Sequence, residues 1–273
     1  MSPPGSADPR PFPLLKALAV TAAGIVAMVG GSTLLVLRSG LPLRPQIAIG
    51  TLLLAVPALA ALAIEPGRWR AVHGPLYATA RLLFLSVLLG IALWVGSAGL
   101  LEVQSLVAPP PQAYLDGFRA IHAALAPRNF GDALVSVLVI AALPGLCEEL
   151  VMRGVLLPSL AQAWRGSMAG PVAITALLFA LIHLDPYRFG FTLALGLVLG
   201  WLRLSTGSLW PSVVAHLSLN TLTFLVAPYV DDPSQAYTPS PVLGAACLAS
   251  GAAVAWPLLR AMRVPFDSPR RDS

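Results

Sequence analysis

Eight long apolar runs divide this chain and leave little sequence between them. A run of about 20 apolar residues can cross the hydrocarbon layer of a bilayer as a helix. Lipid offers no hydrogen bonds to exposed backbone, and the chain lacks the alternating pattern of a membrane barrel, so these runs must be helical. We predict an all-α fold, a polytopic membrane helix bundle of about eight transmembrane helices, over residues 14–37, 47–64, 82–107, 133–157, 168–184, 189–204, 209–228 and 241–262.

The composition leaves no room for a water-soluble surface. Hydrophobic residues make up 57% of the 273 residues and charged residues only 11%, against about 25% charged residues in an average soluble domain. We therefore expect a single transmembrane helical domain over residues 14–262, with a catalytic core at about 130–228. Residues 1–13, which are rich in proline, and residues 264–273 are predicted to be flexible tails.

The basic residues stand singly in the loops, which argues against nucleic acid as a partner. Most of them fall on one side if the amino terminus is cytoplasmic, as the positive-inside rule requires. The first apolar run is too long for a signal peptide. We predict a multi-pass protein of the cell membrane with both termini in the cytoplasm. The arginine-rich, lysine-poor composition suggests a bacterial inner membrane.

Apolar residues from Pro109 to Arg128 recur at spacings of three and four, which predicts an amphipathic helix at the membrane interface. This helix either connects two spans or covers the entrance of a site.

Six polar residues stand where lipid-facing residues would be expected. An ionised side chain near the bilayer centre costs about 3 kcal/mol or more unless it is paired or faces a cavity, so such residues are functional candidates. They are Glu148, Glu149, Arg153, His183, His216 and Asn220.

The spacing of these residues separates two carboxylates. Glu149 and Arg153 are four apart, which places them on one helical face and predicts an internal ion pair. Glu148 is rotated by about 100° from Glu149 and can face a cavity. Alternatively, both carboxylates belong to a charge cluster at the membrane surface.

Two further pairs repeat the four-residue spacing. Phe179 and His183 lie one helical turn apart, as do His216 and Asn220. An imidazole and an amide on one face supply convergent hydrogen-bonding groups. Alternatively, His183 is a polar residue of the interface, and His216 and Asn220 join helices by hydrogen bonds.

A carboxylate, two imidazoles and an amide suit a hydrolase, because the carboxylate can take a proton from water and an imidazole can orient that water. The remaining imidazole and the amide can donate to an oxyanion. A non-catalytic membrane transporter or channel would also use intramembrane Glu, Arg and His. A haem held by His183 and His216, and a thiol nucleophile at Cys147, are weaker alternatives.

Three motifs stand in order on successive membrane segments. Residues 148–153 match EExxxR, residues 179–183 match FxxxH and residues 216–220 match HxxxN. Each motif alone is weak, but together they resemble the CPBP family of intramembrane proteases, named for CAAX-prenyl proteases and bacteriocin-processing enzymes. The resemblance covers residues 130–228.

The resemblance implies an intramembrane endopeptidase that cleaves a membrane-associated protein or peptide. Glu148 and His183 would activate water, His216 and Asn220 would stabilise the oxyanion, and Glu149, Arg153 and Phe179 would support the site. Both glutamic-type and metal-dependent mechanisms have been discussed for the family. Zinc is possible, since a carboxylate and two histidines form an allowed ligand set, but the sequence lacks the HExxH spacing. Prenylated, bacteriocin-like and anchor-sorting substrates all fit.

Overall fold

The computed structural model describes residues 10–74, 79–230 and 238–263, and these residues contain helices and no strand. Six helical stretches are long and apolar enough to span a membrane. They are α1 (Leu14–Arg38), α2 (Leu43–Ile64), α4 (Ala80–Val107), the continuous run α6 to α8 (Phe130–Ala163), α10 (Phe189–Thr206) and α12 (Pro241–Ala261). With the shorter apolar helix α9 (Ala169–Ile182) and with α11 (Trp210–Val230), all eight predicted runs are helical. The prediction of an all-α polytopic bundle is confirmed.

Short elements connect or interrupt the long helices. The segment after α2 forms η1 (Pro66–Arg68) and α3 (Trp69–His73), and the predicted amphipathic segment forms α5 (Gln112–Leu125). Its place at the membrane interface remains a prediction. The fourth span is built from α6 (Phe130–Val137), η2 (Leu138–Ala142), α7 (Leu143–Glu149), η3 (Leu150–Leu156) and α8 (Leu157–Ala163).

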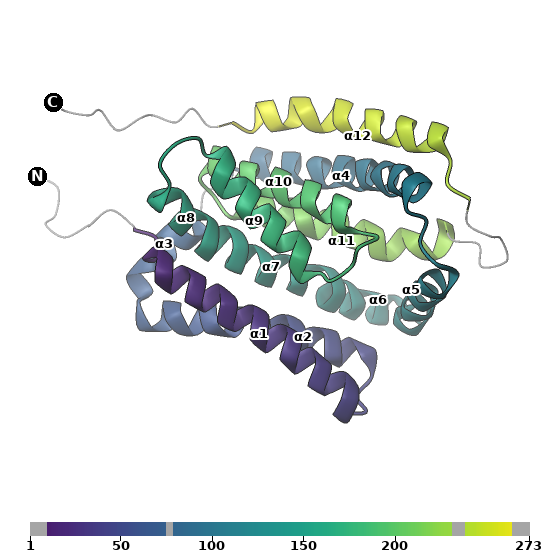
Figure 1. The fold of residues 1–273 in the computed structure, drawn as a ribbon, viewed down its shortest axis with the longest axis horizontal. Helices are drawn as coiled ribbons and strands as arrows, with labels where there is room; N and C mark the ends of the chain where they lie inside the picture. Colours follow the sequence, from purple (N-terminus) through teal and green to yellow (C-terminus); the bar gives the residue numbers. More distant parts are fainter. Residues whose placement is uncertain (1–9, 75–78, 231–237, 264–273) are drawn as a thin grey trace, which may run out of the picture.

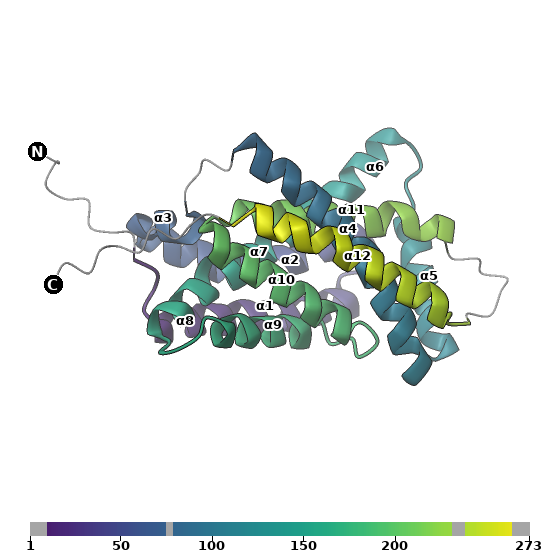
Figure 2. The ribbon, with the colours of Figure 1, turned by 90° about the horizontal axis from the view of Figure 1, so that it is seen from above.

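The span α6 to α8 runs through the middle of the bundle (Figure 1). The pair α1 and α2 packs on one side of it, and the pair α4 and α12 lies on the far side, with α9, α10 and α11 between. The first turn of α1 and the last turn of α12 lie at the same end of the bundle, as Figure 2 also shows. An even number of crossings predicts this arrangement.

Two clusters of buried apolar side chains meet at the central span. Val151 and Val155 pack in the cluster shared with α1 and α2. Met152 and Leu156 belong to the cluster formed with α4, α9, α10 and α11. Because η3 contributes to both clusters, every residue from Leu150 to Leu156 is buried. The part of the central span that forms η3 is therefore surrounded by protein rather than by lipid.

The described end of the predicted amino-terminal tail packs against the bundle. Phe12 is buried, and Arg68 donates to the backbone oxygens of Arg10 and Pro11. Residues 10–13 therefore belong to the bundle, whereas residues 1–9 and the predicted tail at 264–273 lie outside the described residues.

Small residues let α4 and α12 approach closely. A Cβ atom added at Gly251 would lie 2.7 Å from the Cα of Gly96 and 2.8 Å from the oxygen of Ala92. Such contacts between small residues are a main source of packing energy for helices in lipid. The close packing of α4 against α12 therefore depends on the absence of a side chain at Gly251.

We expect Gly251→Ala to lower the free energy of unfolding by about 1–3 kcal/mol, because the added methyl group overpacks a backbone contact. Gly30→Ala is the matched control: a Cβ atom there meets nothing within 4 Å, and alanine is the better helix former. Midpoints of thermal unfolding in detergent measure both effects. Equal midpoints for the two variants would contradict the close packing of α4 and α12.

Candidate active site

The two adjacent carboxylates stand at the end of α7, between two helical stretches with i→i+5 hydrogen bonding. These stretches, η2 and η3, lie directly before and after α7. Wide turns of this kind are rare and occur often at functional sites. They change the direction in which side chains leave the central span, and no sequence pattern indicated them.

The predicted ion pair of Glu149 and Arg153 is present. Arg153 Nη1 donates to Glu149 Oε1 at 2.8 Å, and both side chains are fully buried. Arg153 Nη2 donates to the backbone oxygen of Gly196 on α10 at 3.0 Å, and the guanidinium lies 4.6 Å from the ring centre of Phe179 on α9. One buried arginine thus joins the central span to α9 and α10.

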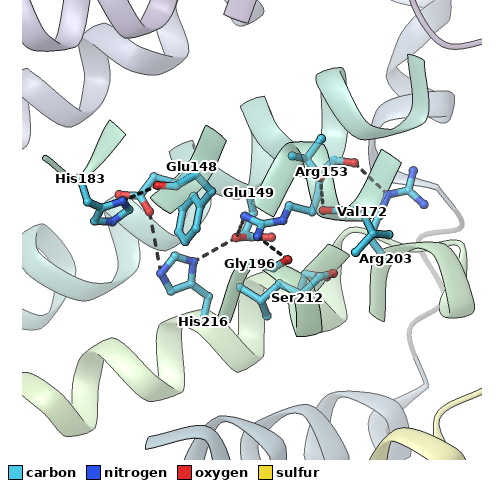
Figure 3. Close-up of polar contacts among 12 residues, drawn as sticks. Glu148, Glu149, Arg153, Val172, His183, Gly196, Arg203, Ser212 and His216 are labelled. Atoms are coloured by element: carbon cyan, nitrogen blue, oxygen red, sulfur yellow. Dashed lines mark hydrogen bonds and ion pairs between the residues drawn. The ribbon is translucent and has the colours of Figure 1, made fainter. Parts of the chain in front are cut away.

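His216 on α11 faces both carboxylates (Figure 3). Its Nδ1 lies 3.1 Å from Glu149 Oε1, and its Nε2 lies 3.8 Å from Glu148 Oε2. Because Glu149 Oε1 also accepts from Arg153, Nδ1 is the donor in the shorter contact. The hydrogen bond to Glu149 therefore fixes the ring so that Nε2 points to Glu148.

His183 directly follows α9 and packs against the ring of Phe179. Its Nδ1 donates to the backbone oxygen of Phe179 at 2.7 Å, which leaves Nε2 of the neutral ring as an acceptor. The Phe179 ring lies edge-on to the rings of both His183 and His216, with centres 4.7 and 5.9 Å apart. Phe179 is thus the wall that separates and orients the two imidazoles.

Asn220 lies one helical turn after His216 on α11 and is half-buried. Unlike the side chains of Glu149 and Arg153, the side chain of Asn220 forms no hydrogen bond with another described residue. The structure therefore places Asn220 on the predicted helix but does not join it to the carboxylates.

Exposure rises stepwise across the site. Glu149 and Arg153 are fully buried, the His216 side chain is 3% exposed, and the Glu148 side chain is 17% exposed. His183 is exposed at the edge. The groups that could meet a substrate lie at the accessible edge, and the ion pair lies behind them.

Two contributors were missed by sequence reasoning. Gly196 acts only through its backbone oxygen, so no side chain marks it. Arg203 lies in the predicted run 189–204 and was not among the six candidate residues, but it is buried, and its Nε donates to the backbone oxygen of Arg153 at 3.1 Å. Its Nη2 donates to the oxygen of Ala71 at 2.9 Å. The signal that could have found it is a lone arginine inside an apolar run.

A catalytic zinc ion is commonly held by three protein side chains. In the described part of the chain, no three His, Cys, Asp or Glu side chains are arranged to hold a metal ion. Zinc bound by Glu148, His183 and His216 stays a prediction. Cys147 is buried among apolar side chains of the first cluster, an environment in which thiols are inert.

We expect Arg153→Met to lower the free energy of unfolding by about 3–5 kcal/mol, because the change leaves the Glu149 carboxylate buried without a counter-charge. The double variant Glu149→Gln/Arg153→Met should recover part of that loss, while the exposed Arg165 changed to Met serves as the control. Unfolding of the purified protein by a denaturing detergent measures all three. Wild-type stability in Arg153→Met would contradict a buried pair.

Comparison with known proteins adds one match. Residues 130–222 match the family model described as Rce1-like, type II CAAX prenyl endopeptidase. No curated protein and no solved structure matches the chain. The matched segment begins at the first residue of α6, ends at Leu222 within α11 and contains all three motifs.

The match agrees with the resemblance that the motifs predicted, and it favours a protease over a transporter or a haem protein. It supports intramembrane endopeptidase activity in general and leaves the substrate and the catalytic type open. Residues 130–222 of this helical membrane protein are therefore similar to Rce1-like proteases, and this similarity is consistent with the CPBP family of intramembrane proteases.

Proposed function

We propose that this protein is an endopeptidase that hydrolyses a peptide bond of a membrane-associated protein or peptide with a water activated by Glu148 and His183. The observation that carries the proposal is the position of Glu148. Its carboxylate faces His216 at 3.8 Å and is partly accessible, while the neighbouring Glu149 is committed to Arg153.

The hydrogen bond of His183 to Phe179 supports a role in orienting the water. With Nδ1 donating to the backbone, Nε2 of the neutral ring can accept one hydrogen of a water molecule. Glu148 then accepts the other hydrogen as general base. Two acceptors on one water turn its lone pair toward the carbonyl carbon of the substrate.

The hydrogen bond of His216 to Glu149 supports a role as oxyanion donor. Because Nδ1 already donates to Glu149, Nε2 can donate only in the doubly protonated ring. Two carboxylates and one guanidinium surround that ring, so the four groups together then carry no net charge. Asn220, whose amide is not engaged by another described residue, is the second donor.

The reaction balances with these groups alone. The water oxygen bonds to the carbonyl carbon, its proton moves to Glu148, and the carbonyl oxygen becomes the oxyanion that His216 and Asn220 hold. When the carbon–nitrogen bond breaks, Glu148 returns the proton to the leaving amine. The oxyanion becomes a carbonyl again, and the products are a new carboxylic acid, which keeps the second proton of the water, and a new amine.

Glu149, Arg153 and Phe179 support the site without taking part in bond exchange. Glu149 fixes the orientation of His216, and Arg153 fixes Glu149. A buried hydrogen bond that sets the tautomer of a catalytic histidine is a common device of hydrolases.

We place the protein in the cell membrane of a bacterium, with both termini in the cytoplasm. The substrate class we favour is a membrane protein or peptide rather than a prenylated one, because the composition indicates a bacterial source. The lipid bilayer is the second partner.

We expect Glu148→Gln to lower cleavage by about 100- to 10,000-fold, the usual contribution of a general base, while membrane insertion is unchanged. The matched control is Glu102→Gln on α4, whose carboxylate accepts from the backbone of Ser240. Mass spectrometry of membrane proteins from cells with wild type, Glu148→Gln or Glu102→Gln reads out changes in carboxy-terminal length.

If no polypeptide differs in length between wild type and Glu148→Gln, the proposed reaction is wrong. Loss of an ion flux in Glu148→Gln, without any proteolysis by the wild type, would assign the polar residues to transport instead.

We expect a strong zinc chelator to leave the activity of the purified enzyme unchanged, because water activation by Glu148 and His183 needs no metal ligand set. Activity is measured before chelation, after it and after zinc is restored. Complete inhibition that zinc reverses would contradict the metal-free mechanism, and Glu148, His183 and His216 would then be the ligand candidates.

A further inference from the structure

An apolar groove of about 690 Å³ lies on the outside of the bundle, away from the catalytic groups. This volume is within the range of sites for small organic molecules. Its walls come from three helices, α9, α10 and α12. The lining residues that matter below are Ala173, Trp201, Trp256, Arg260 and Arg263.

The groove follows from how the three helices pack. The closest contacts of α12 are with α4, through Gly251 and Gly96. The closest contacts of α10 are with α9, where a Cβ atom at Gly196 would lie 2.9 Å from Ala176. Since each helix is tied to a different neighbour, the space between α12 and the pair α9 and α10 is not filled by protein. In a bilayer, lipid must fill it.

Two arginines stand at one end of the groove, each against a tryptophan. The guanidinium of Arg260 lies 4.6 Å from the ring centre of Trp256, and that of Arg263 lies 5.1 Å from the ring centre of Trp201. Stacking on a ring face leaves the N–H edge of a guanidinium open, and that edge matches a phosphate group.

No acidic residue lines the groove. Arg260 and Arg263 are both exposed, and neither forms an ion pair with a described residue. Arg260 is in the last turn of α12, and tryptophan and arginine gather where helices leave the hydrocarbon layer. The groove thus combines an apolar wall at membrane depth with two arginines at headgroup depth that no described acidic residue pairs with.

We propose that this groove binds an anionic phospholipid. Its phosphate lies between Arg260 and Arg263, and an acyl chain runs along the apolar wall of α9 and α10. The charge complementarity selects an anionic headgroup over a zwitterionic one, because each basic residue near the surface favours anionic lipid by about a factor of five. The site is separate from the carboxylates, so it stands or falls independently of the proposed reaction.

The test uses the full-length protein in nanodiscs made of phosphatidylglycerol and phosphatidylcholine in equal amounts. Native mass spectrometry after release from the nanodisc counts the lipids that stay bound. Wild type should retain phosphatidylglycerol in preference to phosphatidylcholine. The double variant Arg260→Gln/Arg263→Gln should lose that preference by about 25-fold. The control is Arg81→Gln, an exposed arginine at the start of α4 outside the groove.

A second variant tests the apolar wall. Ala173 is exposed and lines the groove, so Ala173→Trp fills the space and leaves both arginines in place. Loss of the bound phosphatidylglycerol in Ala173→Trp, with an unchanged unfolding midpoint, supports the proposal.

Three results would overturn the proposal. The first is equal retention of both lipids by wild type, and the second is an equal effect of Arg81→Gln and the double variant. The third is a wild type that carries no lipid but loses a dimer on Ala173→Trp, which would assign the groove to a second copy of the chain.

Discussion

The buried ion pair of Glu149 and Arg153 is the interaction on which the arrangement of the site depends. A charge pair without access to water is unfavourable unless each partner is held by further hydrogen bonds. Here Arg153 also binds the backbone oxygen of Gly196 and the face of Phe179, while Glu149 also binds His216. Because these contacts reach α9, α10 and α11, the pair determines where both histidines lie relative to Glu148.

Arg203 supports this pair from the other side. It binds the backbone of Arg153 and also the backbone of α3, the short helix after α2. Burying an arginine that is bound only to backbone oxygens costs free energy of folding. Here the buried arginine joins two segments of the chain through hydrogen bonds. The central span, α10 and α3 are therefore connected behind the carboxylates.

Much of the fold could be predicted from the sequence, because lipid forces every apolar run into a helix. The predicted limits of the eight runs differ from the observed helices by only a few residues for that reason. The pairing of Glu149 with Arg153 followed from helical spacing. The contribution of Gly196 could not be predicted, because it acts only through a backbone oxygen. Arg203 could have been singled out as a lone arginine inside an apolar run, but its backbone partners lie on segments that are distant in the sequence. The same holds for η2 and η3, which depend on hydrogen bonds inside the folded span. Asn220 lies on the predicted helix, and its role in the site remains a prediction.

The shortness of α9 has a consequence for how water reaches a site inside a membrane. A helix of 14 residues is about 21 Å long, whereas the hydrocarbon layer is about 30 Å thick. A bilayer next to such a helix thins or admits headgroups to reduce the mismatch. His183 stands at the end of α9 and is exposed, so we expect such thinning beside this histidine. The proposed hydrolysis consumes one water per turnover, and a thinner bilayer at this place would shorten the path by which that water enters.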